Sequence, residues 1–304
     1  MVGLLAFVGI AATVRTASAF CRTSACSTCE LDPDTGCRTG TPIQWPQFCV
    51  SYSMQYQASA TVDLATATDA AEKAFGVWQN VRCPGSRERP SIYLGSMFGS
   101  VACKVHEYNQ VDGNANIIMF HDDVWPYAEG EGVLALTTVT FSKKTGDIYD
   151  VDMEVNAQQR LSTGEPVDPF AYDLQSIMTH EAGHFIGLAH SFDPAATMWP
   201  QYAPGTDTFR DLSDDDVAAV CAVYPPQPLG ACDFVPRQGF SPECGLYPQA
   251  RGSCSLTRAS GSGIARDGAL SMAWLAAFAL SLCRRRVRPE SRETSARRAM
   301  GRAQ

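Results

Sequence analysis

Basic side chains are scarce in the body of this sequence. Of the 304 residues, positions 20–254 hold 13 Lys and Arg against 29 Asp and Glu. Nucleic-acid binding needs clustered cations that contact phosphates, so this imbalance argues against a nucleic-acid partner. Ten further Arg follow Cys254, together with only three acids. The basic charge of the chain is therefore concentrated at its C-terminal end.

Long apolar runs are also few, and we find no internal repeat. The composition, 45% hydrophobic and 18% charged, is that of an ordinary globular protein. It excludes wholesale disorder, a collagen-like repeat and a multi-pass membrane protein. The length corresponds to about two domains, although not all of the residues need belong to a folded domain.

The N-terminus has the features of an export signal. Residues 4–14 are an apolar run, and Ala17-Ser18-Ala19 is a small-residue cleavage site. We therefore predict a signal peptide over residues 1–19, a mature chain that starts at Phe20, and an extracellular or cell-surface location. No Lys or Arg precedes the apolar run, which is unusual for a signal peptide, and a buried N-terminal helix is the alternative.

The C-terminus combines an apolar segment with a basic tail. Residues 268–283 carry no charge and are followed by the Arg cluster that starts at Arg284. Sixteen residues fall just short of the roughly 17–25 that span a bilayer, and flanking Arg favours the cytoplasmic side. We predict that residues 264–304 make transient or anchored membrane contact, and that residues 226–263 form a Cys-containing linker.

Twelve cysteines are too many for a reduced cytosolic chain of this size without a metal cluster. Cys283 lies in the apolar segment, so eleven remain in the exported part, an odd number. Cys26-Ser27-Thr28-Cys29 is compatible with half a zinc ribbon, a redox pair or a disulfide staple, and the staple suits an exported chain best. We predict that residues 20–45 form a disulfide-held extension.

Hydrophobic periodicity predicts both strands and helices. Helical spacing covers residues 66–80 and 172–188, and a last helix opens after Ser213, with Asp214, Asp215 and Asp216 suited to the positive end of its dipole. The predicted strands are 49–56, 91–94, 116–120, 133–141 and 147–155. Lys143-Lys144-Thr145-Gly146 is typical of a hairpin turn between the last two.

Three of the five histidines fall within eleven residues, in the run HEAGHFIGLAH from His180 to His190. On a helix, residues four apart share a face, so His180 and His184 can bind one metal with Glu181 beside them. Gly187 allows a left-handed turn, after which His190 can supply a third ligand. Three imidazoles and one open position are typical of catalytic zinc, where a carboxylate moves the proton.

This run, continued by Ser191 and by Asp193-Pro194-Ala195-Ala196-Thr197-Met198-Trp199-Pro200, resembles the metzincin metalloproteases and, within them, the matrixins or matrix metalloproteases. The resemblance covers roughly residues 45–225, and we place the catalytic domain at 46–225. It implies an α+β fold, in which helices pack on a twisted, mixed and mostly parallel sheet with an antiparallel edge strand.

The resemblance also implies roles for individual residues. His180, His184 and His190 would bind zinc, and Glu181 would be the general base and then the proton donor. Met198 would lie in the Met-turn beneath the metal, and Pro200 and Tyr202 would wall the S1′ pocket. Residues 133–140 would be the edge strand that pairs with an extended peptide substrate. A fully paired interior strand is the alternative.

The sequence departs from the family pattern at other metal sites. Many matrixins hold a second, structural zinc on three His and an Asp, but only His106 and His121 remain here and Tyr149 replaces one expected ligand. We therefore expect no second zinc. An acidic set on the last predicted strand could bind calcium through its carboxylates, and a solvated strand face is the alternative. This set consists of Asp147, Asp150, Asp152 and Glu154.

Two cysteines resemble parts of known processing devices. Cys83, in Arg82-Cys83-Pro84-Gly85, faintly resembles the propeptide motif that keeps the family latent, but we expect it in a disulfide. Cys254, its Gly/Ser spacer, the apolar segment and the Arg cluster resemble bacterial surface-sorting tails of the myxobacterial type. Processing at Cys254 would leave ten cysteines in residues 20–253.

We therefore expect an exported, monomeric zinc endopeptidase that acts on protein or peptide substrates. The main alternative is a catalytically dead metzincin scaffold that serves as a surface adhesion or binding module, and intact Glu181 argues against it. A deaminase-type zinc hydrolase would need Cys ligands that the motif lacks.

Overall fold

The largest sheet of the molecule is mixed, as expected. The computed structural model describes residues 19–26, 28–103, 105–127, 132–243 and 294–303. Within them, six strands lie in the order β2-β4-β6-β5-β10-β9. Their bounds are Ser53–Met54 for β2, Ile117–His121 for β4, Ile148–Asn156 for β6, Val133–Ser142 for β5, Thr294–Ala303 for β10 and Gln201–Tyr202 for β9. Strands β2, β4 and β6 are parallel, and β5 runs antiparallel to β6 across the predicted hairpin turn.

Strand β5 has neighbours on both sides. Strand β10 pairs antiparallel with it along almost its whole length and also pairs in parallel with β9. The prediction that residues 133–140 form a free edge is therefore wrong for the chain with β10 in place. The physical reason is that β6 satisfies only one side of β5, and the outward N–H and C=O groups can pair with any extended segment.

The described residues contain three helices, and each has an N-cap side chain that satisfies a free backbone N–H. They are α1 (Leu64–Asn80), α2 (Leu174–Phe185) and α3 (Asp214–Val223), capped by Asp63, Asp173 and Ser213. All three predicted helices are confirmed. Helix α2 ends at Phe185, earlier than predicted, because Gly187 leaves the helical region with a φ of +93°.

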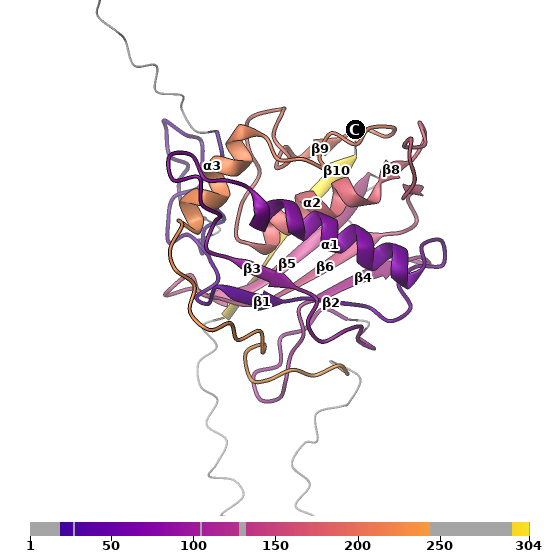
Figure 1. The fold of residues 1–304 in the computed structure, drawn as a ribbon, viewed down its shortest axis with the longest axis horizontal. Helices are drawn as coiled ribbons and strands as arrows, with labels where there is room; N and C mark the ends of the chain where they lie inside the picture. The colour runs from indigo at the N-terminus through magenta and orange to yellow at the C-terminus, as the bar shows by residue number, and fades with distance from the viewer. Residues whose placement is uncertain (1–18, 27, 104, 128–131, 244–293, 304) are drawn as a thin grey trace, which may run out of the picture.

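Helices α1 and α2 lie over the same face of the sheet (Figure 1). Phe75 and Trp78 of α1 join Phe185 of α2 in the main hydrophobic core. The Trp78 indole N–H also donates to the Thr179 carbonyl at 2.8 Å. Burying large apolar side chains of this kind contributes about 1.5–3 kcal/mol each, so this packing holds α1 against α2.

Two small parallel pairs and four disulfides complete the described fold. Strand β1 (Cys49–Ser51) pairs with β3 (Tyr93–Gly95), and β7 (Leu161–Ser162) pairs with β8 (Tyr172–Asp173). The disulfides are Cys21–Cys37, Cys26–Cys29, Cys49–Cys232 and Cys83–Cys221. The staple at Cys26–Cys29 and the disulfide predicted for Cys83 are thus confirmed.

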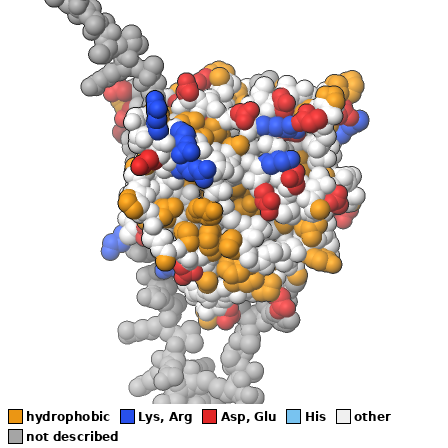
Figure 2. Space-filling model, viewed as in Figure 1, with side chains coloured by type: hydrophobic (Ala, Val, Ile, Leu, Met, Phe, Trp, Pro, Cys, Tyr) orange, Lys and Arg blue, Asp and Glu red, His pale blue; other side chains and the backbone are white. Residues whose placement is uncertain are grey.

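Several predicted features lie outside the described residues. They are residues 1–18 of the signal peptide, Cys254 and the apolar segment 268–283. Among the residues that are described, none of the helices has the length and apolar character needed to cross a membrane. Acidic and basic side chains are interspersed on the face of the molecule drawn in Figure 2.

Candidate metal centre and active site

Helix α2 places two histidines and a glutamate at one buried position. His180, Glu181 and His184 are 5%, 1% and 1% exposed, respectively. The imidazole rings of His180 and His184, one helical turn apart, have centroids separated by 4.9 Å. The i, i+4 spacing in the sequence thus gives the shared face that it predicted.

Gly187 turns the chain back toward these side chains. Its φ is +93°, and a Cβ added there would lie 2.6 Å from the Ile43 carbonyl oxygen. Both facts restrict the position to glycine. The turn returns His190 to the helix, where its Nε2 lies 3.2 Å from the Nε2 of His184.

The three imidazoles converge with their ligand atoms turned inward. One ligand atom from each of His180, His184 and His190 lies within 4.8 Å of the others. The Nδ1 of His180 is 2.6 Å from the Thr197 carbonyl, and the Nδ1 of His184 is 2.9 Å from the Leu188 carbonyl. Because a carbonyl can only accept, each Nδ1 carries the hydrogen, and each Nε2 keeps a lone pair for the shared point.

The donor set fits a zinc ion. The His180 Nε2 atom is buried and has no hydrogen-bond partner in the part of the chain that the structure describes, a costly arrangement unless another group occupies the shared point. Burial, followed by the nearby His190, lowers the pKa of His180 to about 3 and lowers that of His184 well below its usual value. The two imidazoles are therefore neutral at pH 7, the form that binds zinc.

Glu181 is held by a residue that the sequence analysis missed. The Thr137 hydroxyl on β5 donates to Glu181 Oε2 at 2.6 Å. Thr137 is fully buried, so this contact is shielded from water. A threonine inside a strand gives no sequence signal of such a role. The bond fixes the carboxylate beside the three histidines.

The segment beneath the histidines is fixed by an aspartate of α3. Met198 is buried, and its sulfur lies so close to Gly183 of α2 that a Cβ there would be 2.1 Å away. Asp216 accepts the N–H groups of Thr197 and Met198 at 2.7 and 3.1 Å. The sequence analysis treated Asp216 only as a helix-dipole acid. Its carboxylate in fact secures the segment whose Thr197 carbonyl orients His180.

Asp215, the residue before Asp216, holds the segment that directly follows His190. One carboxylate oxygen of Asp215 accepts the Ser191 hydroxyl at 2.7 Å, directly after His190. The other accepts the backbone N–H groups of Ala19 and Phe20 at 2.8 and 3.0 Å. The start of the described chain therefore lies against the segment that carries the third histidine.

A small apolar pocket opens next to His180 and Glu181. Pro200 and Tyr202 line it, at the positions expected for the S1′ wall. Sequence reasoning missed the other apolar lining residues, which are Leu134, Ile177, Trp199 and Phe209. Phe209 stacks on Tyr202 with ring centroids 4.9 Å apart, so the pocket is bounded on one side by two aromatic rings.

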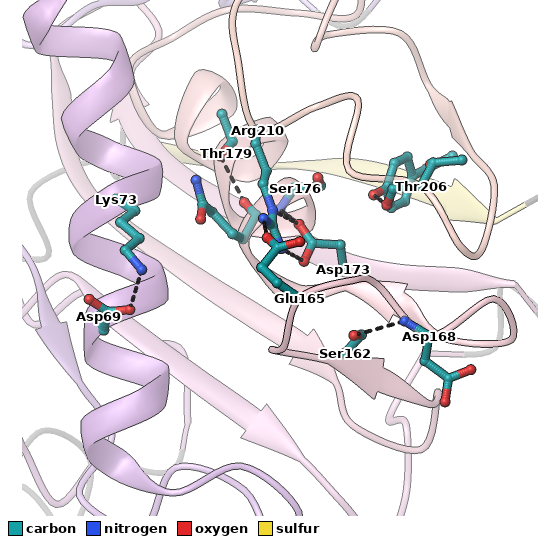
Figure 3. Close-up of polar contacts among 12 residues, drawn as sticks. Asp69, Lys73, Ser162, Glu165, Asp168, Asp173, Ser176, Thr179, Thr206 and Arg210 are labelled. Carbon is teal, nitrogen blue, oxygen red and sulfur yellow. Dashed lines mark hydrogen bonds and ion pairs between the residues drawn. The ribbon is translucent and has the colours of Figure 1, made fainter.

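An ion-pair cluster holds the loop that bears Phe209. Arg210 donates to both carboxylate oxygens of Asp173, at 2.8 and 2.6 Å, and also pairs with Glu165 (Figure 3). Asp173 is the N-cap of α2 and has a side chain only 1% exposed. The cluster thereby connects the wall of the pocket to the start of the helix that carries the histidines.

Comparison with known proteins agrees with this geometry. A sequence model of the matrixin family matches residues 44–225, more than half of the chain. The chain belongs to the matrixin family. Its relatives include Metalloendoproteinase 1-MMP of Arabidopsis thaliana, 36% identical over 109 residues, a stretch that covers 36% of this chain and 28% of the relative. Human neutrophil collagenase is 42% identical over 130 residues, or 40% of this chain and 26% of that protein.

A longer match joins this matrixin to human matrix metalloproteinase-16. The two are 29% identical over 187 residues, which make up 60% of this chain and 28% of the relative. The chain thus spans less than a third of the length of these relatives. The similarity concerns the domain that holds the histidines.

The acidic set of this matrixin does not converge on one point. Asp150 and Asp152 are adjacent and each 2% exposed, whereas Asp147 is half-buried and accepts the Thr145 hydroxyl at 2.7 Å. Glu154 faces His106 and His121 at 3.4 and 2.9 Å.

The buried acids of this set differ in the direction in which their surroundings shift the pKa. Burial raises the pKa of both Asp150 and Asp152 well above the usual value. Burial would raise the pKa of Glu154 too, but hydrogen bonds from His106, His121 and Tyr127 outweigh it and hold that pKa at about 2.

Proposed function

We propose that this matrixin is an exported zinc endopeptidase. The observation that carries the proposal is the convergence of three imidazoles beside a buried carboxylate, at the mouth of an apolar pocket. His180, His184 and His190 would hold the ion. Zinc bound there would polarise the scissile carbonyl and lower the pKa of a water molecule.

Glu181 would carry the proton. Its carboxylate accepts a proton from the attacking water and later delivers it to the nitrogen of the departing amine. The Thr137 hydroxyl, bonded to Oε2, keeps the carboxylate in one orientation during this exchange. Met198 and the Thr197 carbonyl, both secured by Asp216, would keep the floor of the site and the His180 ring in place.

The substrate would be an extended peptide that lies between β5 and β9. The pairing of β10 with both strands supports this placement, because β10 is itself an extended backbone between them. An apolar side chain on the amine side of the scissile bond would enter the pocket walled by Pro200 and Tyr202. The chemistry of the lining favours an aliphatic or aromatic side chain.

The decisive experiment is chelator-sensitive proteolysis. The chain processed near Cys254, which lacks β10, should cleave casein or a fluorogenic peptide library, lose activity in 1,10-phenanthroline and recover activity when zinc is restored. A protein that holds one zinc per chain but cleaves neither substrate would favour the alternative, a surface adhesion or binding module on a dead scaffold.

Export is the second part of the proposal. Four disulfides among the described residues support an oxidising destination. We expect processing near Cys254, after which the mature protein would lack Arg284–Gln304 and be attached to the cell surface or released. Loss of these residues would also remove β10 and open the outer side of β5. Intact-mass measurement of the mature protein tests this, and a mass that includes Gln304 would contradict it.

Calcium remains a proposal for a smaller set than the sequence indicated. Asp150 and Asp152 are adjacent buried carboxylates, and Asp150 Oδ1 has no hydrogen-bond partner within the described ranges. Two carboxylates in one buried site need a shared proton or a cation. Calcium should therefore raise the melting temperature of the wild type and leave that of Asp150→Asn unchanged. Equal shifts would indicate binding elsewhere.

A further inference from the structure

The N-terminal extension reaches the zinc-ligand loop by backbone pairing. The carbonyl of Gly187 accepts the Thr23 N–H at 2.9 Å, and the Ala189 N–H donates to the Cys21 carbonyl at 2.9 Å. Arg22 and Leu188 form an antiparallel bridge between these two bonds. The extension therefore adds a short strand to the turn that connects α2 to His190.

The same short strand is also anchored to a second segment. The Thr23 carbonyl accepts the Ile43 N–H at 2.8 Å, and the Cys21–Cys37 disulfide lies next to it in the chain. Cys21 is 6% exposed. Residues 21–23 are thus bonded both to the ligand loop and to the segment around Ile43, which makes them a rigid support.

One side chain of this strand touches the hydrogen-bond network of the metal centre. The Thr23 hydroxyl donates to the Leu188 carbonyl at 2.9 Å. That same carbonyl accepts the Nδ1–H of His184 at 2.9 Å. A hydroxyl from the extension and a zinc-ligand imidazole therefore share one acceptor, and Leu188 itself is fully buried.

We propose that Thr23 is a positioning residue for the zinc centre, acting through the Leu188 carbonyl on His184 and on the turn to His190. By fixing this carbonyl, the hydroxyl holds the imidazole in the ring orientation and tautomer that direct Nε2 at the metal. The proposal depends on the three-histidine zinc site proposed above, and it does not depend on peptide hydrolysis.

The expected loss of zinc affinity can be estimated from the effect of removing groups that hydrogen-bond to metal ligands. Removing such a partner typically weakens metal affinity roughly 10–100-fold. Thr23 acts one bond further out, through a carbonyl that keeps its bond to His184. We therefore expect Thr23→Val to raise the zinc dissociation constant roughly tenfold, at the low end of this range.

Chelator competition on the full chain measures this directly. Thr23→Val should bind zinc about tenfold more weakly, whereas Thr23→Ser, which keeps the hydroxyl, should bind like wild type. The matched control is Thr39→Val, since the Thr39 hydroxyl also donates to a carbonyl of the extension, that of Glu30 at 2.8 Å, away from the metal centre. The Thr39 variant should retain wild-type affinity.

Unchanged affinity in Thr23→Val, or an equal loss in Thr39→Val, would overturn the proposal. A wild-type chain that binds no zinc would instead contradict the proposed function. The control for general loosening is the urea unfolding of the zinc-free variants, which should be similar.

A measurement on the wild type removes any dependence on how the variants fold. If Thr23 supports the zinc site, zinc must stabilise the Thr23 segment in return, because coupling between two sites is reciprocal. Hydrogen exchange at the Thr23 and Ala189 amides should therefore slow when zinc is added, while the Thr39 amide, bonded to the Glu30 carbonyl, should not respond. Exchange that is equal with and without zinc at all three amides would refute the coupling.

Discussion

The contact between Thr137 and Glu181 gives the sharpest prediction about catalysis. Thr137→Val removes a buried hydroxyl donor to a carboxylate while keeping the shape of the side chain. A hydrogen bond to a charged group contributes about 1.5–3 kcal/mol. If the whole of this energy is lost from the transition state, the activation barrier rises by the same amount. Because about 1.4 kcal/mol corresponds to a factor of ten, kcat/KM then falls roughly 10–100-fold.

The adjacent residue supplies the matched control. The Thr138 hydroxyl is buried and has no hydrogen-bond partner among the described residues, so Thr138→Val removes the same group without breaking a described bond. Both variants and the wild type are loaded with zinc, checked for one zinc per chain, and assayed with a fluorogenic peptide under subsaturating conditions. The reasoning fails if Thr137→Val retains wild-type kcat/KM, or if Thr138→Val loses as much.

Three further predictions follow from single contacts. His190→Ala should lower zinc occupancy and activity together, because two protein ligands remain; one tightly held zinc with full activity would place the third ligand elsewhere. Arg210→Ala should lower the free energy of unfolding in urea by about 3–5 kcal/mol, because it leaves the buried Asp173 carboxylate without its cation. The control is Arg160→Ala, which breaks an exposed pair with Asp168 and should cost less than about 1 kcal/mol. Equal losses in the two variants would contradict the stabilising role of the Arg210–Asp173 pair. Asp150→Asn should stabilise the calcium-free protein at pH 7.5. Because burial raises the folded-state pKa of Asp150, its contribution to stability is present at low pH and is lost as pH rises through that pKa. The advantage of the variant should therefore vanish toward pH 4, and an advantage independent of pH would refute this account.

Local sequence rules predicted the parts of the site that depend on local geometry. The i, i+4 spacing of His180 and His184 needs only a helix, and Gly187 needs only a left-handed turn, so both were readable. The helix and strand periodicities likewise located all three helices and the hairpin between β5 and β6. The family resemblance added the mixed, mostly parallel sheet with one antiparallel strand.

Contacts between residues far apart in the sequence could not be predicted from local sequence patterns. Thr137 and Glu181 are 44 residues apart, and Thr23 and Leu188 are 165 apart. Asp214, Asp215 and Asp216 all suit a helix N-terminus, yet Asp216 alone binds the Met198 segment. Only the packing of α3 decides which of three identical side chains points inward. The pairing of β10 with β5 is equally non-local, since an open strand edge accepts any extended segment.

The central claim is that Glu181 moves the proton while the three histidines hold zinc. It is tested most directly by zinc content and peptide hydrolysis measured together on Glu181→Ala. The ligands survive in this variant, so we predict one zinc per chain, as in wild type, with cleavage reduced by roughly 10²–10⁴-fold or more. Near-normal turnover by the zinc-loaded variant would contradict the account.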